Sequence, residues 1–228
     1  MREPPKVVLF TSSVPEEGKT ALTLSFGCFV ALVNRSCVVV DCDLRRSAVH
    51  RSLGGQRVLG LVDFLLGKSG LDEVIQTDAA TGLDYVAAGS PPGSPTDLLS
   101  SPAMSSALAE LTPRYDVVLL DSAPVLAVAD TRCLHPFVDQ TVFVIRWRGT
   151  RRNTAHAAAR RLENSGFQRR VRSTQPRGSQ VLPAIRRRVS ARGLQRLLPR
   201  VVPVPGRSRA HPPDARVPPD QQAFRAEP

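Results

Sequence analysis

The sequence VVLFTSSVPEEGKT, residues 7–20, joins an apolar run to a loop that ends in Gly-Lys-Thr and leads into a helical pattern. This strand–loop–helix order is the context in which a phosphate-binding loop works. Backbone N–H groups and the helix dipole favour an anion at the start of such a helix. Lys19 can reach outer phosphates, and the Thr20 hydroxyl can ligate Mg²⁺. A plain strand–turn–helix with a solvated Lys19 is the alternative, but the context favours nucleotide binding.

The loop departs from the general pattern G-x-x-x-x-G-K-[ST], because Ser13 stands where that pattern has its first Gly. It resembles the loop TSSxPGEGKT of the bacterial tyrosine kinases of capsule and exopolysaccharide synthesis. Glu16 stands where that family has Gly. We expect a positive φ at this position, which opposes a side chain, and a carboxylate near the phosphates. The resemblance therefore predicts a recognisable nucleotide site with reduced affinity.

Two carboxylates follow a second apolar run, in CVVVDCDLRR, residues 37–46. Asp41 and Asp43 lie two residues apart, so an extended chain places them on the same side, where a cation or a lysine would relieve their repulsion. Spacing alone allows an equal alternative, in which one Asp caps the next helix. The stretch 40–45 also resembles the second Walker A-type box of the bacterial tyrosine kinases, which implies that Asp41 holds the metal and that Asp43 activates the acceptor hydroxyl.

A third apolar run ends in a carboxylate, in YDVVLLDSAP, residues 115–124. Phosphate-loop enzymes place such an Asp beside the metal, although an apolar run before Asp commonly marks only a strand that leaves the core. Together with the first two stretches, the functional interpretation of Asp121 is favoured. The stretch DSAP differs slightly from the Asp-Thr/Ser-Pro-Pro of the family. The resemblance covers residues 5–167.

The resemblance implies a set of site residues and two cofactors, ATP and Mg²⁺. The catalytic residues would be Lys19, Asp41, Asp43 and Asp121. The cofactor-binding residues would be Ser13, Glu17, Gly18, Lys19, Thr20 and Ala21. The metal ligands would be Thr20, Asp41 and Asp121.

Apolar strands that alternate with helices predict an α/β fold, a P-loop NTPase with a doubly wound, mostly parallel sheet. Ligands bind such sheets at the carboxyl ends of the strands. We expect strands over 6–10, 37–40, 83–86, 115–121 and 140–145. We expect helices over 20–33, which should be covered on most sides, 60–67, 71–75, from 96, 130–139, which should be broken before Pro136, and 155–164. Residues 1–167 are predicted to form the P-loop domain.

The formal charge of +11 belongs to the end of the chain. Residues 169–228 contain 14 Arg, no Lys and only 3 acidic residues, whereas the rest is balanced. Residues 168–228 are therefore predicted to be a disordered Arg/Pro-rich tail. It could be an electrostatic arm, but we favour a shifted reading frame, which sequencing of the genomic locus would test. No specific nucleic-acid partner is expected of the globular part.

The resemblance predicts an ATP-dependent protein-tyrosine autokinase that regulates polysaccharide export. Its expected partners are a membrane polysaccharide co-polymerase or activator and a tyrosine-bearing protein substrate, and it allows a homo-oligomer. With four scattered cysteines and no apolar run of bilayer length, the chain is predicted to be cytoplasmic, held at the inner membrane through a partner. One alternative is a partition-type ATPase, although such proteins carry an early loop lysine that is absent here. The other alternative is a non-catalytic remnant of such a kinase.

Overall fold

The computed structural model describes residues 4–54, 59–90 and 93–167. Within them, six strands form one sheet in the order β3-β4-β2-β5-β1-β6. Every neighbouring pair is parallel except β3 and β4, which are antiparallel. The strands are β1 (Val7–Ser12), β2 (Cys37–Asp41), β3 (Ile75–Thr77), β4 (Asp84–Val86), β5 (Val117–Asp121) and β6 (Gln140–Val144).

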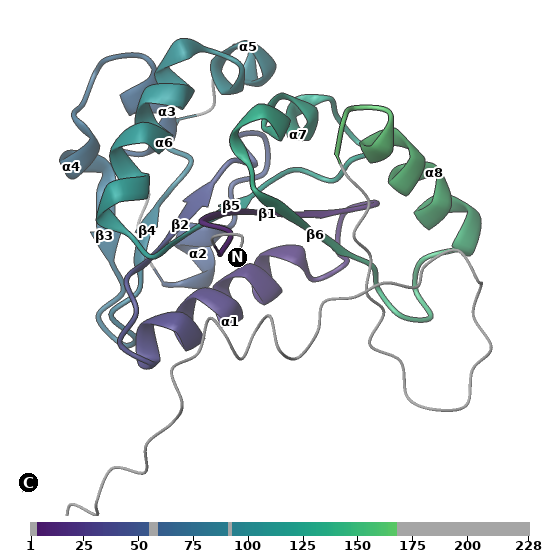
Figure 1. Cartoon of the computed structure of the whole chain (residues 1–228), viewed down its shortest axis with the longest axis horizontal. Helices are drawn as coiled ribbons and strands as arrows, with labels where there is room; N and C mark the ends of the chain where they lie inside the picture. Colours follow the sequence, from purple (N-terminus) through teal and green to yellow (C-terminus); the bar gives the residue numbers. More distant parts are fainter. Residues whose placement is uncertain (1–3, 55–58, 91–92, 168–228) are drawn as a thin grey trace, which may run out of the picture.

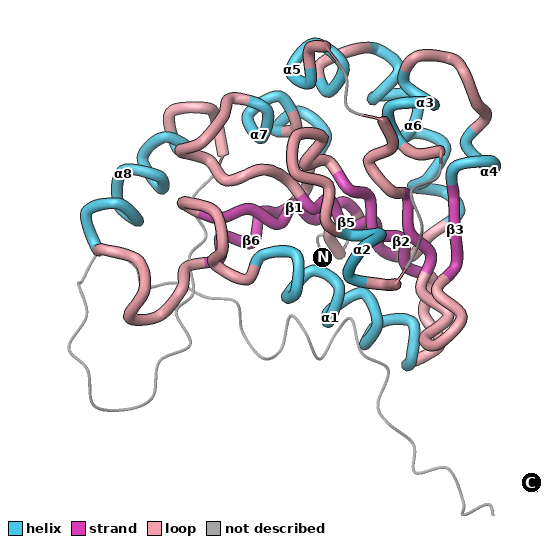
Figure 2. The backbone as a smooth tube through the Cα atoms, turned by 180° about the vertical axis from the view of Figure 1, so that it is seen from behind, coloured by secondary structure: helices cyan, strands magenta, loops and turns pink. Residues whose placement is uncertain are grey.

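Helices cover both faces of the sheet, so the predicted doubly wound, mostly parallel α/β fold is confirmed. Figure 1 shows α1 on one side and α3, α5 and α6 on the other, and the view from behind in Figure 2 keeps the same layers apart. The helices are α1 (Lys19–Leu32), α2 (Val49–Ser52), α3 (Leu61–Leu65), α4 (Leu71–Val74), α5 (Pro95–Leu99), α6 (Pro102–Arg114), α7 (Asp130–Cys133), the 3₁₀ turn η1 (His135–Phe137) and α8 (Arg152–Glu163).

Two hydrophobic cores result, because successive strand residues point to opposite faces of a sheet. Leu9 and Val38 join the core that α3, α6 and α8 cover. Val8 and Val39 join the core that α1 covers. The central strands are buried along their whole length, as expected for parallel strands covered on both faces.

Helix α1 differs from the prediction that it is covered on most sides. Only an inner stripe is buried, whereas Leu22, Phe29 and Leu32 are 45%, 42% and 68% exposed. Gly27 lies on the inner stripe, where a Cβ would lie 3.0 Å from a Val39 methyl group. The lack of charge along this helix therefore does not mean that it is buried all round.

Most predicted elements are present, with shifted ends. The first strand runs on to Ser12, and the second includes Asp41. The prediction of a helix through residue 75 is wrong, because Ile75 begins the antiparallel strand β3. Helix α6 was not predicted, although its buried residues follow helical spacing; they are Met104, Ala107, Leu108 and Leu111.

The predicted Arg- and Pro-rich tail, residues 168–228, lies outside the described residues. No helix in the described ranges has the length and apolar character that crossing a bilayer demands.

Candidate functional site

The loop between β1 and α1 has the backbone of a phosphate-binding loop. Gly18 precedes α1 with φ 86° and Glu16 has φ 66°, so the positive φ predicted at Glu16 is confirmed. The first amides of a helix have no acceptor within the helix, and here they follow directly on Gly18. An anion is therefore favoured at the start of α1.

Asp121, at the end of β5, accepts hydrogen bonds from three side chains of α1. Its carboxylate is fully buried and accepts hydrogen bonds from Lys19 Nζ at 2.8 Å and from Thr20 Oγ1 at 2.7 Å. Thr23 Oγ1 donates to the same carboxylate at 3.2 Å. Thr23 was not predicted as a site residue, although its position four residues after Lys19 places it on the same helix face.

Asp41 is the neighbour of Asp121 across the sheet, since the two residues are paired in register between β2 and β5. Its Oδ2 accepts the backbone N–H groups of Ala48 and Val49 at the start of α2, at 3.0 and 3.1 Å. The capping alternative is thus confirmed for Asp41. Burial, and after it the charge of Asp121, raises the pKa of Asp41 to about 7. Two buried carboxylates share one lysine here, and such a site suits an added cation.

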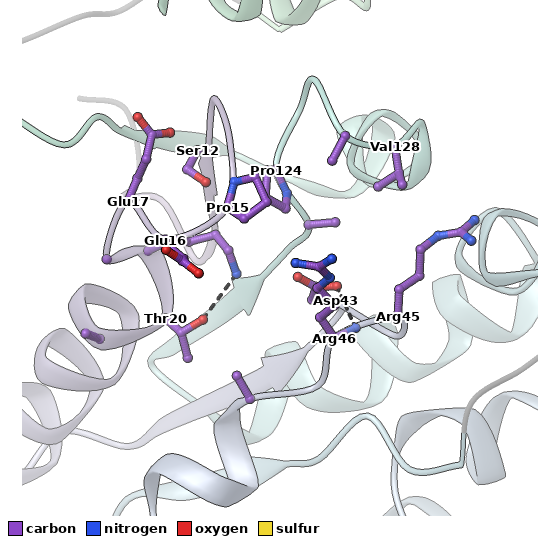
Figure 3. A pocket seen from close by; sticks show the side chains of 16 residues that line it. Ser12, Pro15, Glu16, Glu17, Thr20, Asp43, Arg45, Arg46, Pro124 and Val128 are labelled. Atoms are coloured by element: carbon purple, nitrogen blue, oxygen red, sulfur yellow. Dashed lines mark hydrogen bonds between the residues drawn. The ribbon is translucent and has the colours of Figure 1, made fainter. Parts of the chain in front are cut away.

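Asp43 lies at the cavity beside the loop (Figure 3). Burial raises the pKa of its carboxyl group, and Lys19 opposes that effect. The cavity has a volume of about 580 Å³, within the range of small-molecule sites. Its lining comprises Ser12, Pro15, Glu16, Glu17, Gly18, Lys19, Thr20, Ala21, Asp43, Arg45, Arg46, Ala48, Ala123, Pro124, Ala127 and Val128.

The predicted residues therefore meet at one edge of the sheet, but not all of them line the cavity. Lys19, Thr20 and Asp43 do so, whereas Asp41 and Asp121 lie fully buried and outside its lining. In the described part of the chain, no three His, Cys, Asp or Glu side chains form a complete metal site. A magnesium ion would complete its shell with hydroxyl, water or phosphate oxygens, as Mg²⁺ usually does.

Comparisons with known proteins agree with this geometry. No family model matches the chain. The tyrosine-protein kinase YwqD of Bacillus subtilis is 34% identical over 140 residues, which are 61% of this chain and 59% of YwqD. The solved VpsO kinase domain is 33% identical, with a TM-score of 0.69 over 72% of this chain and 81% of that domain. The chain belongs to the bacterial tyrosine kinase family.

Other bacterial tyrosine kinases show the same likeness at lower identity. The kinase domain of the Escherichia coli tyrosine kinase ETK is 26% identical, with a TM-score of 0.71 over 78% of this chain and 74% of that domain. The tyrosine-protein kinase Wzc of Salmonella typhimurium is 28% identical over 162 residues, which are 71% of this chain but 22% of Wzc. The chain thus spans about a fifth of the length of several curated bacterial tyrosine kinases.

The side chains of two loop residues that were predicted to bind the cofactor, Ser13 and Glu17, are buried in this bacterial tyrosine kinase. The Glu17 carboxylate accepts hydrogen bonds from the backbone of Ser13 and Val14, within its own loop. In Figure 3 the Glu17 side chain points away from Asp43. Ser13 does not line the cavity, and its Oγ is buried without a partner among the described residues. The family resemblance implied cofactor-binding roles at both positions; in the structure the Glu17 carboxylate is hydrogen-bonded within the chain, and the Ser13 side chain is buried.

Arg45 forms an ion pair that holds the segment carrying Asp43 in place. Its guanidinium group donates to the buried Asp130 carboxylate through Nε at 2.7 Å, and Thr96 Oγ1 donates to the same carboxylate at 2.6 Å. The contacts link the end of β2 with α5 and α7. Sequence reasoning missed Asp130 and Thr96, because no local signal joins residues this far apart in the chain.

Proposed function

We propose that the chain is an ATP-dependent protein-tyrosine kinase domain that regulates capsule or exopolysaccharide synthesis. One observation carries the proposal: Lys19, Thr20 and Asp43 line the same cavity beside the phosphate-binding loop, and Asp121 accepts hydrogen bonds from the first two. Family membership supports the reaction type.

Each of these side chains has a role that suits phosphoryl transfer. The amides at the start of α1 would bind phosphate oxygens, and the ammonium group of Lys19 would offset charge that develops on the transferred group. Of the three predicted catalytic carboxylates, Asp43 lines the cavity, so it would be the one to accept the proton of a tyrosine hydroxyl. Arg46 also lines the cavity and forms no ion pair within the described ranges.

The donor set fits a magnesium ion. The Thr20 hydroxyl and the Asp41 and Asp121 carboxylates would hold it, directly or through water. Burial, and after it the charge of Asp121, raises the pKa of Asp41, and a cation bound here would favour the ionised carboxylate. A bound Mg²⁺ neutralises phosphate charge and orients the transferred group.

A weakened, nucleotide-binding remnant is a second candidate function, which the backbone of Glu16 favours. A non-glycine residue in the left-handed region carries a conformational cost, and its carboxylate borders the cavity. Both effects would lower ATP affinity without removing the site.

The expected partners belong to the proposal as well. They are a membrane polysaccharide co-polymerase or activator, and a protein that supplies the acceptor tyrosine. A homo-oligomer and a position at the inner membrane through such a partner are consistent with the family.

Transfer of radiolabelled phosphate from ATP to a tyrosine-rich copolymer tests the proposal. We expect phosphotyrosine to form with the parent chain and to be absent with Lys19→Ala, which removes a cavity cation. Asp43→Asn should keep ATP binding and lose transfer. ATP hydrolysis without any phosphotyrosine would favour the partition-type ATPase, and ATP binding without either reaction would favour the remnant.

A further inference from the structure

Glu16 and Glu17 are neighbours in the sequence, but their carboxylates have different surroundings. Glu16 is exposed at the cavity, whereas Glu17 is only 7% exposed. The Oε2 atom of Glu17 accepts the backbone N–H groups of Ser13 at 2.5 Å and Val14 at 2.9 Å. These hydrogen bonds fold the first half of the loop back toward the start of α1.

The other oxygen of Glu17 reaches a second loop. Oε1 accepts the backbone N–H of Arg146 at 3.3 Å and the Thr150 hydroxyl. The segment 146–150, which follows β6, is itself a tight turn, because the N–H groups of Gly149 and Thr150 both donate to the Arg146 carbonyl oxygen. One buried carboxylate thus joins two loops that are more than 120 residues apart in the chain.

We propose that Glu17 is a positioning residue that couples the phosphate-binding loop to the segment 146–150, so that nucleotide affinity depends on Thr150. This inference rests on the proposed function. The left-handed residues Glu16 and Gly18 flank Glu17, and such backbone persists only where surrounding contacts determine it. The side chain of Glu17 supplies these contacts, and the loop then presents its amides in one arrangement.

A purely electrostatic role for Glu17 predicts the opposite effect of mutation. A carboxylate beside a phosphate site repels the ligand, so its neutralisation would tighten binding. In the structure, four donors are directed at this carboxylate and offset its charge. The hydrogen bonds of a buried carboxylate are the stronger ones, so their loss should dominate over the relief of repulsion.

The first experiment compares the two neighbouring glutamates by calorimetric titration with Mg-ATP. Glu17→Gln should weaken binding roughly tenfold, because an amide cannot accept hydrogen bonds at both of its ends. Glu16→Gln should bind more tightly than the parent, because it removes a carboxylate from the cavity lining. Glu110→Gln, on the exposed face of α6, should leave the affinity unchanged. Unchanged or tighter binding by Glu17→Gln would overturn the proposal.

The second experiment tests the coupling itself. Thr150→Val should weaken binding roughly threefold to tenfold, and Thr150→Ser, which keeps the hydroxyl, should restore parental affinity. Adding Thr150→Val to Glu17→Gln should have little further effect, because the contact is already lost. Equal affinities of the Val and Ser variants, or additive losses, would contradict the coupling.

Hydrogen exchange of the loop amides, measured without nucleotide, tests the coupling of the two loops independently of whether the chain binds ATP. Thr150→Val should speed exchange of the Ser13 and Val14 amides, although the substitution lies in the other loop. If the parent chain does not bind ATP, the proposed function fails and the exchange result still decides the coupling. Unaltered exchange at both amides would overturn it.

Discussion

At the scale of single residues, Glu16 is the side chain that we expect to limit ATP affinity at the candidate site. It has φ 66° in a loop whose resemblance to TSSxPGEGKT places Gly at this position, and it is exposed at the cavity. The sequence was sufficient to predict this backbone, because the flanking loop pattern fixes where glycine is needed. It was not sufficient to predict the place of the Glu17 side chain, because two of that side chain's hydrogen bonds come from a distant loop.

Glu16→Gly should raise ATP affinity roughly tenfold, the equivalent of ~1.4 kcal/mol. Glycine releases the cost of the left-handed backbone and removes a negative charge, and both effects exceed the added flexibility of the loop. Titration with saturating Mg²⁺ at two salt concentrations measures the change. Asn34→Gly, at φ 59° beyond the end of α1, is the matched control and should leave ATP affinity unchanged. Weaker binding by Glu16→Gly would show that the loop accommodates Glu16.

At the scale of elements, the close approach of α1 to the sheet depends on Gly27. Ala at this position would gain helix propensity, but its Cβ would lie 3.0 Å from Val39 and 3.2 Å from the methyl groups of Leu83. Both neighbours are fully buried. We expect Gly27→Ala to lower the free energy of unfolding by about 1 kcal/mol, because overpacking exceeds the propensity gain.

Urea denaturation measures this difference, with Ser25→Ala on the exposed side of the same helix as the control. Ser25→Ala should be neutral or slightly stabilising, because alanine has the higher helix propensity. Higher stability of Gly27→Ala would mean that Val39 and Leu83 move aside without cost.

The segments that precede β2 and β5 are joined by Asp116, and this contact should depend on pH. Its carboxylate accepts hydrogen bonds from Ser36 N and Oγ at 3.1 Å and from Arg35 at 3.0 Å. Desolvation raises the pKa of Asp116, but the Ser36 hydrogen bonds and Arg35 outweigh it, so the pKa lies below its usual range. A lowered pKa stabilises the fold above the pKa of the unfolded chain, and this stabilisation is lost as the pH falls through the folded pKa.

Asp116→Asn should therefore lower the free energy of unfolding at pH 7. Because the carboxylate is 39% exposed, solvent screening keeps the loss below about 1 kcal/mol. As the pH falls below the usual pKa of an aspartate the difference should shrink, and the parent and the variant should converge once the pH lies below the lowered folded pKa of Asp116. Asp72→Asn, which removes a more exposed ion pair with Arg114, should change little at any pH. A loss that persists at low pH would exclude the carboxylate charge as its source.

Helices and strands whose apolar residues repeat with a clear period could be predicted from the sequence. The exceptions have physical reasons. Strand β3 is short and half exposed, so three residues gave no apolar run, and its pairing with β4 is antiparallel. Helix α1 carries no charge after Lys19, so its composition resembles that of a buried helix. Its exposed face could not be predicted, because solvent exposure depends on what lies beyond the helix rather than on its composition.

At the scale of the whole molecule, the position of the tyrosines bears on the acceptor. The sequence contains two, Tyr85 and Tyr115. The Tyr85 hydroxyl donates to Gln76 at 2.9 Å from a buried ring, and the Tyr115 hydroxyl donates to the Asp84 carboxylate at 2.8 Å. Desolvation, and after it the hydrogen bond with Asp84, raises the pKa of Tyr115. Both hydroxyls are therefore engaged in hydrogen bonds within the chain.

Incubation with Mg-ATP and a tyrosine copolymer should therefore label the copolymer and leave Tyr85 and Tyr115 unmodified, as measured by mass spectrometry. A Tyr85→Phe/Tyr115→Phe variant should label the copolymer to the same extent if it remains folded, which circular dichroism checks. Phosphate on Tyr115 of the folded parent would contradict this expectation.

The sequence predicted the main layers of the molecule and the edge at which the site residues meet. The order of the strands along the sheet was not predicted, because alternating strands and helices indicate a parallel sheet but not which strands are neighbours. The hydrogen bonds that Arg45 and Thr96 donate to Asp130 could not be predicted, since they form only once α5 and α7 are in place.

Helix α1 carries no charged side chain after Lys19 and no acidic residue in its first turn. It therefore contains no ion pair that could hold it in helical form before it meets the sheet, and a short helix with glycine, threonine and aromatic residues is marginal in water. During folding, α1 should form only as Thr23, Leu24, Gly27 and Val30 dock on β2 and β5. The phosphate-binding loop begins this helix, so its shape should appear late in refolding, together with the central core. The time at which nucleotide binding recovers during refolding would then report when the chain has completed its fold.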